Sequence, residues 1–246
     1  AVAATLGIAL AVGGANAFNM WWERDTNGLM SRTRRRPLPT GRMRARDAFV
    51  FASVLSLLSL VVLAVGTNLL TAVLGGLAIV SYVAVYTPLK YRTPAALIIG
   101  AVPGAAPPLL GWTAVTGSID APAIVLFGIL LVWQLPHFIA IALYRKDEYA
   151  RAGIKVVPLV RGDAIAKIQA VAWVLVLVPL SFMLVPLGAA GPIYLLGAAL
   201  LGAVFLGWSF TGLDNGAGPR WARGYFLASL GYLRALTLVL VADVLL

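Results

Sequence analysis

One polar stretch near the start of the chain carries the residues with the clearest chemical potential. Asn19, Glu23 and Asn27 lie four residues apart, so a helix would place all three on one face, with Asp25 between them. Carboxylate and amide oxygens are ligands that Mg²⁺ accepts. This spacing predicts a cation site, and the alternative is a helix end whose polar residues meet water. Asp25 lies about 200° from Glu23 around an ideal helix, so it joins the site only if the helix unwinds there.

Eight arginines lie in the same stretch, between Arg24 and Arg46. A guanidinium group can bind two phosphate oxygens at once, and we expect Arg32 and Arg36 to face a ligand. Attachment to anionic lipid accounts for several of the other arginines. Cation ligands beside a dense cationic patch indicate a magnesium-bound polyanion, and a diphosphate at a membrane surface is the obvious candidate.

A second group of polar residues lies between residues 133 and 149. Gln134 and His137 interrupt an apolar segment, and polar residues inside a membrane usually face a cavity or a bundle interior. His137 has two interpretations, a hydrogen-bonded structural role or a contact with substrate. Asp147 and Glu148 follow in a loop, where they form either a second cation site opposite the first or a pair of solvated charges.

Membrane-spanning helices are the elements that must hold these residues. The chain is 61% hydrophobic and only 11% charged, which is typical of an integral membrane protein. A transmembrane helix needs about 20 apolar residues, and the pattern predicts an all-α polytopic transmembrane helix bundle. The absence of cysteine excludes disulfides and cysteine-ligated metals. The expected spans are about 1–22, 47–65, 69–87, 94–116, 121–143, 165–187, 190–210 and 225–246.

The positive charges lie on one side of the predicted membrane. Every Lys and Arg except Arg234 falls in or beside loops that share one face, and the positive-inside rule makes this face cytoplasmic. The net charge of +10 therefore does not indicate nucleic acid. Arg234 lies about halfway along the last span and has three interpretations. Its side chain reaches toward the membrane surface, it pairs with a polar group, or the last helix starts later than residue 225. The prolines of 103–108 predict a helix break, either beside a cavity or as a packing kink.

Three stretches of the chain resemble a known family. They read NMWWERDTNGLMSRTRRRPLPTGR at 19–42, YTPLKYRTPAALIIGAVPGAAPPLLGWTAVTG at 86–117 and WQLPHFIAIALYRKDEYARAGIKVVPLVRG at 133–162. In this order they are similar to the UbiA-type intramembrane prenyltransferases, and within them to the branch of protoheme IX farnesyltransferases (haem O synthases). The resemblance covers nearly the whole chain, and the middle stretch points to the haem branch rather than to the quinone enzymes.

The resemblance implies one integral membrane prenyltransferase domain over residues 1–246, built as a helix bundle around a central cavity open to lipid. Eight spans are expected here, so the family's first helix is expected to be missing from an N-terminally truncated chain. The family's first acidic motif falls on Asn19, Glu23 and Asn27, where Glu23 keeps the usual charge and Asn27 removes one. The second motif falls on 145–149, with Glu148 in place of the usual aspartate.

The activity implied by the resemblance is transfer of a farnesyl group from farnesyl diphosphate to a vinyl group of haem b, giving haem o and diphosphate. Mg²⁺ is the implied cofactor, and haem b is a substrate. The implied catalytic residues are Asn19, Glu23, Arg32, Arg36, Arg145 and Glu148. The implied metal ligands are Asn19, Glu23, Asp25, Asn27, Asp147 and Glu148. Substrate contacts are expected from Lys90, Arg92, Gln134, His137, Tyr144 and Tyr149.

The expected partners are farnesyl diphosphate, haem b, membrane lipid and other membrane proteins of haem biosynthesis or oxidase assembly. The expected location is a prokaryotic plasma membrane. Three alternatives stay open. The first is a UbiA-type enzyme that prenylates a quinone precursor or a chlorin. The second is a transporter or channel with a basic mouth, although the spans offer few polar groups, chiefly Gln134, His137 and Arg234. The third is a non-catalytic membrane protein that binds haem or lipid.

Overall fold

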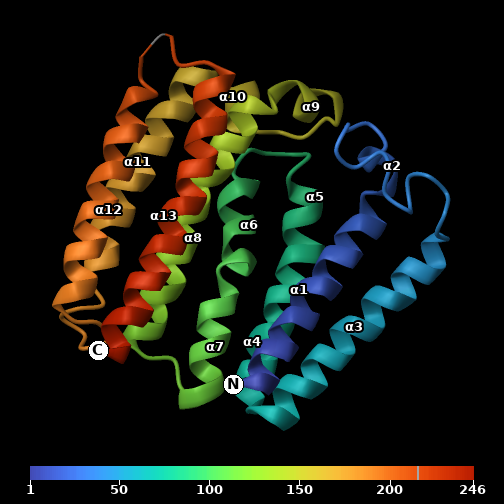
Figure 1. Ribbon diagram of the computed structural model, residues 1–246. Coiled ribbons are helices and arrows are strands. Elements are labelled where there is room, and N and C mark those ends of the chain that lie inside the picture. Colours follow the sequence, from blue (N-terminus) through green and yellow to red (C-terminus); the bar gives the residue numbers. More distant parts are fainter. Residues whose placement is uncertain (215) are drawn as a thin grey trace. The chain divides into compact units, whose positions relative to one another are not determined.

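The structure, a computed structural model, describes residues 1–214 and 216–246, and within these residues every regular element is a helix. Among the described residues, eight helical segments are long and apolar enough to cross a membrane, which confirms the predicted number of spans and the all-α transmembrane class (Figure 1). These spans are α1 (Val2–Trp22), α3 (Ala45–Gly66), α4 with η1 and α5 (Leu69–Val80, Ser81–Tyr86 and Thr87–Leu89), α6 with α7 (Ala96–Gly104 and Ala106–Thr116), α8 (Ala121–Tyr144), α11 (Asp163–Phe182), α12 (Pro192–Thr211) and α13 (Pro219–Leu245).

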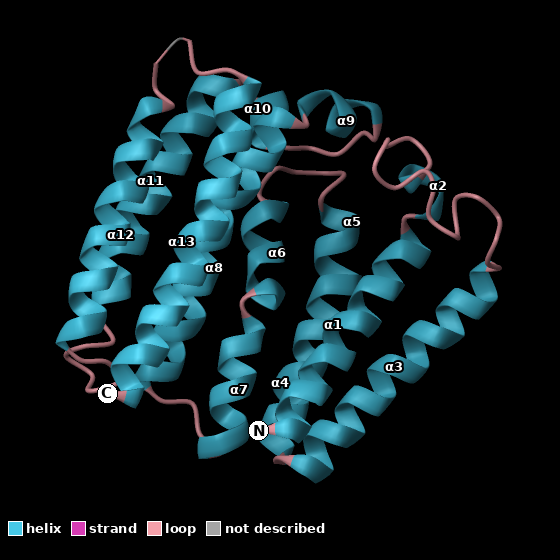
Figure 2. Cartoon of the chain, viewed as in Figure 1, coloured by secondary structure: helices cyan, strands magenta, loops and turns pink. Residues whose placement is uncertain are grey.

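Short helices also occur in the connections between spans. Figure 2 shows two of them, at residues 24–27 and 146–151, as small cyan turns among the pink loops. The short helices are α2 (Arg24–Asn27), α9 (Lys146–Arg151) and α10 (Val157–Val160). The sequence pattern does not predict them, because four to six residues are too few to show a helical period.

The chain folds into two compact units. Unit 1 comprises Ala1–Ile119 together with Asp147–Lys155, and unit 2 comprises Asp120–Lys146 together with Val156–Leu246. Unit 1 therefore carries the acidic residues of both predicted cation sites, whereas unit 2 carries Gln134 and His137. That residues 1–246 act as one domain stays a prediction.

Small residues let α1 and α3 pack closely within unit 1. Ser59 of α3 donates a hydrogen bond to the Gly7 carbonyl at 2.8 Å. A Cβ atom at Gly14 would lie 3.0 Å from the backbone nitrogen of Ser56 and 3.3 Å from the carbonyl oxygen of Ala52. The two backbones are therefore too close at Gly14 for a larger side chain, as in other membrane helix pairs joined through small residues. The buried residues of α1 recur every three or four positions: Ala4, Gly7, Ala11, Gly14 and Ala17.

Two spans of unit 1 are irregular. The helix break predicted at 103–108 is confirmed, because α6 ends at Gly104 and α7 begins at Ala106, with prolines at 103 and 107 on either side. The second irregularity, the π-helical segment η1, was not predicted. Thr87 closes it by donating both its N–H and its hydroxyl group to the Tyr82 carbonyl, the latter at 2.9 Å. Such π-helical turns are rare and often lie at functional sites.

In unit 2, α8 packs against α11 and α13, and α12 packs against α11 and α13. A column of stacked rings joins α12 to α13. The ring centroids of Trp221 and Tyr225 lie 5.0 Å apart, those of Tyr225 and Phe205 5.2 Å apart, and those of Phe205 and Tyr232 5.0 Å apart. These stacked rings add apolar and aromatic contact between α12 and α13.

Two predicted span boundaries are wrong. α11 ends at Phe182 rather than at 187, because the chain enters turns that lead to Gly188 with φ of +70°. α13 begins at Pro219 rather than at 225, and a proline in the first turn favours such a start. The last helix therefore starts earlier than predicted, and the suggestion from Arg234 that it starts later is also wrong. The Arg234 side chain is exposed on this helix.

The close approach at Gly14 generates a stability prediction. Gly14→Ala should lower the free energy of unfolding by about 1–3 kcal/mol, because the new methyl group would displace the Ser56 hydroxyl group and press on backbone atoms of α3 at 3.0 and 3.3 Å. Gly13→Ala is the matched control, since its Cβ would lie 3.6 Å from Leu55, an ordinary contact. Unfolding of both variants in mixed micelles checks this, and equal stabilities would contradict the packing described.

Candidate functional site

One face is shared by Asn19 near the end of α1, Glu23 in the turn after it and Asn27 at the end of α2. Helix α1 ends at Trp22, yet the Glu23 N–H still bonds the Asn19 carbonyl at 3.0 Å, and the Asn27 N–H bonds the Glu23 carbonyl at 2.8 Å. The four-residue bonding pattern thus continues through the turn at Glu23. Glu23 is 5% exposed and Asn27 is 2% exposed, whereas Asp25 is exposed. The structure therefore separates Asp25 from the buried face.

The buried Glu23 carboxylate has a cation and a hydroxyl group as partners. The Lys90 ammonium forms an ion pair with Glu23 Oε1, and the Tyr91 hydroxyl donates to the same oxygen at 2.6 Å. The ammonium also lies 5.4 Å from the ring centroid of Tyr86. Burial lowers the pKa of Lys90, although the neighbouring Glu23 carboxylate raises it in part. Burial and the hydrogen bond to Glu23 raise the pKa of Tyr91.

The two asparagines differ in their partners. The Asn19 side chain donates from Nδ2 to the hydroxyl group of Thr87 at 3.1 Å. The Asn27 backbone carbonyl accepts from the buried Thr33 hydroxyl group at 2.7 Å, but the side-chain Nδ2 of Asn27 has no hydrogen-bond partner within the described residues. A buried donor without a partner costs about 1–3 kcal/mol. A ligand with acceptor oxygens would remove this cost.

The basic residues that were predicted to contact a ligand differ in exposure and in their interaction with Glu23. Arg36 is half-buried, and its pKa is lowered first by burial and then by the like charge of Arg32, while Glu23 opposes the shift. Arg32 and Arg92 are exposed. Unit 1 therefore places the Arg36 guanidinium near enough to the Glu23 carboxylate for the two charges to attract.

The segment Asp147–Lys155 joins the same unit. The Ser31 hydroxyl donates to Glu148 Oε1 at 2.8 Å, and the Lys155 N–H donates to the Lys90 carbonyl at 2.8 Å. These bonds bring Glu148 to the arginine loop that follows α2, whereas Asp147 is exposed and Tyr149 is half-buried. Sequence reasoning did not identify Ser31, Tyr91 or Thr87 as partners, because their contacts join residues far apart in the chain.

The donor set fits a magnesium ion that is shared with a phosphate ligand. Over residues 1–214 and 216–246, no group of three or more His, Cys, Asp or Glu side chains is placed to hold a metal ion. Mg²⁺ usually takes only one or two carboxylates and completes its shell with water and substrate phosphate oxygens. The Glu23 carboxylate and the amide oxygens of Asn19 and Asn27 match such a shell. The unpartnered Asn27 Nδ2 is a donor, so it favours the phosphate oxygens that would share the ion.

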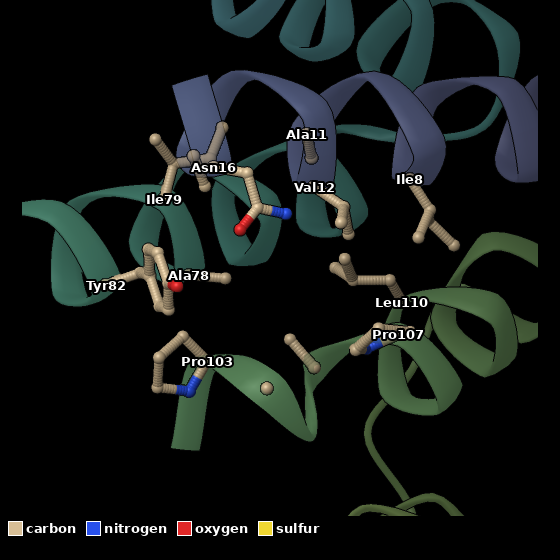
Figure 3. A pocket seen from close by; sticks show the side chains of 13 residues that line it. Ile8, Ala11, Val12, Asn16, Ala78, Ile79, Tyr82, Pro103, Pro107 and Leu110 are labelled. Atoms are coloured by element: carbon tan, nitrogen blue, oxygen red, sulfur yellow. The ribbon is translucent and has the colours of Figure 1, made fainter. Parts of the chain in front are cut away.

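An apolar cavity of about 270 Å³ lies in unit 1 between α1, the α4–η1 segment and the broken α6–α7 span. Figure 3 shows Asn16 and Tyr82 toward one end and Ile8, Pro107 and Leu110 toward the other. Asn16 precedes Asn19 by less than one helical turn, so the cavity and the polar cluster follow one another along α1. This arrangement suits a ligand with a charged head and an apolar tail.

Unit 2 buries the other predicted polar residues. Gln134 is 6% exposed and donates from Nε2 to the Leu130 carbonyl at 3.0 Å. His137 is 7% exposed, and its Nδ1 lies 2.7 Å from the hydroxyl oxygen of Ser229. The Arg145 guanidinium lies 5.3 Å from the ring centroid of Tyr144.

The family profile described as the UbiA prenyltransferase family matches residues 1–230 of the chain. The chain belongs to the UbiA prenyltransferase family. It is therefore a prenyltransferase enzyme, and the resemblance found from the sequence motifs is confirmed.

Named relatives and solved structures agree with this membership. The chain is 55% identical to the protoheme IX farnesyltransferase of Sorangium cellulosum, over 94% of this chain and 82% of that protein. It is 49% identical to the protoheme IX farnesyltransferase of Myxococcus xanthus, over 99% of this chain and 83% of that protein.

Two solved structures show the same UbiA fold. One is from a study of digeranylgeranylglyceryl phosphate synthase, with a TM-score of 0.82 and 18% identity over 98% of this chain and 84% of that chain. The other is a UbiA homologue from Archaeoglobus fulgidus bound to GPP and Mg²⁺, with a TM-score of 0.64 and 16% identity over 97% of this chain and 87% of that chain.

The buried ion pair of this UbiA-family chain generates a second prediction. Lys90→Met should cost about 3–5 kcal/mol of unfolding free energy, because it leaves the Glu23 carboxylate buried without a countercharge. Adding Glu23→Gln should recover part of the loss. Unfolding of the single and double variants in mixed micelles measures both effects, and a double variant no more stable than Lys90→Met alone would contradict the pairing.

Proposed function

We propose that the chain transfers a farnesyl group from farnesyl diphosphate to a vinyl group of haem b, giving haem o with magnesium-assisted loss of diphosphate. The observation that carries the proposal is the succession along α1 of a buried carboxylate-and-amide face, with Lys90 and Arg36 around it, and an apolar cavity. A prenyl diphosphate combines a polyanionic head with an apolar tail and so matches both parts.

In the proposed site, the polar cluster of unit 1 holds the diphosphate. Glu23, Asn19 and Asn27 would hold Mg²⁺, which when bound neutralises charge on the leaving group. Arg36 and Lys90 add positive charge beside the same oxygens, and Asn27 Nδ2 donates to one of them. The archaeal UbiA homologue with GPP and Mg²⁺ supports a prenyl diphosphate and magnesium as the ligands of this fold.

The apolar cavity of unit 1 receives the farnesyl tail. Its walls offer two polar side chains, Asn16 and Tyr82, and are otherwise apolar. As the bond between the first farnesyl carbon and the diphosphate oxygen breaks, the electron pair leaves with diphosphate and an allylic cation forms. A site that excludes water protects this cation until an acceptor attacks.

Haem b is the proposed acceptor. The relatives with 55% and 49% identity are both called protoheme IX farnesyltransferase, which supports haem over a quinone precursor or a chlorin. The terminal vinyl carbon forms the new bond to the farnesyl carbon. The carbocation that results takes the oxygen of a water molecule, whose proton passes to solvent.

The proposed setting is a prokaryotic plasma membrane with the basic loops in the cytoplasm. Eight apolar helices make the chain an integral membrane protein, and both named relatives are bacterial. Membrane lipid surrounds the spans in this setting. Other membrane proteins of haem biosynthesis or oxidase assembly stay predicted partners.

The function is tested by turnover of farnesyl diphosphate with three acceptors: haem b, a quinone precursor and a chlorin. Haem b should give haem o, whereas the quinone precursor and the chlorin should give no prenylated product. Glu23→Gln should slow haem o formation by roughly 10²–10³-fold, the usual effect of removing one group that stabilises developing charge. Asp47→Ala, an exposed carboxylate in the same unit, is the control. Product from another acceptor alone, or none with any, would overturn the proposal.

The role of Asn27 has its own test. Asn27→Asp should lower the Mg²⁺ concentration needed for half-maximal binding of diphosphate by roughly three- to tenfold, because affinity at oxygen sites rises with ligand charge. Asn27→Ala is the neutral control and should bring no gain. Calorimetric titration of Mg²⁺ in the presence of diphosphate measures both, and an unchanged requirement in Asn27→Asp would show that residue 27 does not face the cation.

A further inference from the structure

His137 is the only histidine of the chain, and its two ring nitrogens have different surroundings. Nδ1 lies 2.7 Å from the hydroxyl oxygen of Ser229 on α13. Nε2 has no hydrogen-bond partner in the part of the chain that the structure describes. The ring is nevertheless almost fully buried, with 7% of the residue exposed.

The hydrogen bonds of Ser229 determine which nitrogen of His137 carries the proton. The Ser229 hydroxyl oxygen lies 2.6 Å from the Phe226 carbonyl, which can only accept. A hydroxyl group has one hydrogen atom, and this bond uses it. The second short contact, to His137 Nδ1, therefore needs a proton from the ring. Neutral His137 is protonated at Nδ1, and its Nε2 holds a lone pair.

The ring is also fixed in direction. Its centroid lies 4.7 Å from that of Trp133 in a stacked arrangement and 4.8 Å from that of Phe226. The indole nitrogen of Trp133 donates to the Ser229 carbonyl at 2.8 Å, so the stacking partner and the hydrogen-bond partner of His137 are themselves joined. The Nε2 lone pair is therefore held at a constant orientation between aromatic side chains.

We propose that His137 Nε2 ligates the iron of the haem acceptor; this rests on the proposed function, because it takes haem b as the substrate. A neutral imidazole whose other nitrogen donates a hydrogen bond is the usual metal-binding form of histidine. A single histidine commonly holds haem iron in this way. Ligation at the ring centre would fix the porphyrin and so orient its vinyl group.

The surroundings of His137 suit a porphyrin in two further respects. Phe226 lies 5.7 Å from Tyr144, centroid to centroid, and Tyr144 carries the Arg145 guanidinium above its ring. Arg145 follows His137 by eight residues, about 12 Å along a helix. Unit 2 thus places an aromatic surface beside the ligand nitrogen and a cation toward the end of α8, which matches the apolar face and the propionate edge of haem.

A purely structural histidine would link α8 to α13 without touching iron, and the two roles differ in their dependence on the metal. The purified full chain in nanodiscs is titrated with haem b and with metal-free protoporphyrin IX. In the ferrous haem complex we expect an iron–histidine stretching band by resonance Raman spectroscopy. His137→Gly should abolish the band and weaken binding of haem b but not of protoporphyrin IX, and added imidazole should restore both losses.

Two further variants keep the test decisive if His137→Gly does not fold. His137→Met keeps the bulk of the side chain and should replace the histidine signature by that of a thioether ligand. Ser229→Ala should retain ligation but lower the stretching frequency and weaken haem binding by roughly tenfold, since Nδ1 loses its acceptor. Ser209→Ala is the matched control, because its hydroxyl makes the same bond three residues back, to Leu206 at 2.7 Å, with no histidine beside it.

Each outcome decides between the two roles. A wild-type ferrous haem complex without the iron–histidine band, or equal losses of haem and protoporphyrin IX binding in His137→Gly, would overturn the ligation while leaving the proposed function intact if haem o still forms. A wild-type chain that binds no haem and forms no haem o overturns both. The expected band, its loss and its rescue by imidazole support the ligation.

Discussion

The buried Glu23 carboxylate is the constraint on which the polar end of unit 1 depends. A charge that is 5% exposed must have opposite charge and hydrogen-bond donors beside it, and Lys90 and Tyr91 supply them. This requirement ties the end of α1 to the segment after α5. The Lys90 carbonyl in turn accepts from the Lys155 N–H, so the second acidic segment is held by the same arrangement. The proposed diphosphate site is thus organised around one carboxylate.

Close packing sets the geometry below this polar end. Small residues on α1 bring its backbone against α3, and the break at Ala105 turns the α6–α7 span around the cavity. A regular helix with large side chains would fill this space. Small residues thus account for the tight contact, because they let two helix backbones approach closely. The proline-rich break accounts for the cavity, because irregular backbone in a membrane protein is tolerated where it lines a cavity.

Much of the fold could be predicted from the sequence, because apolar length decides membrane spans almost alone. The eight spans, the break near Pro103 and the shared face of Asn19 and Glu23 follow from length, proline chemistry and helical spacing. The pairing of Glu23 with Lys90 does not, since these residues are 67 positions apart and no local pattern joins them. Ser229 carries no sequence signal either, and its role comes only from the packing of α13 on α8.

The path of the chain between the two units has a consequence for biosynthesis. Residues 147–155 belong to unit 1, yet they follow the first long helix of unit 2 in the sequence. A growing polypeptide folds from its N-terminus as residues emerge from the ribosome. The bonds from Ser31 to Glu148 and from Lys155 to Lys90 cannot form until α8 has been made and handed to the insertion machinery. Unit 1 is therefore completed during translation only after unit 2 has begun, and a gene split between residues 119 and 120 would separate it from its own last segment.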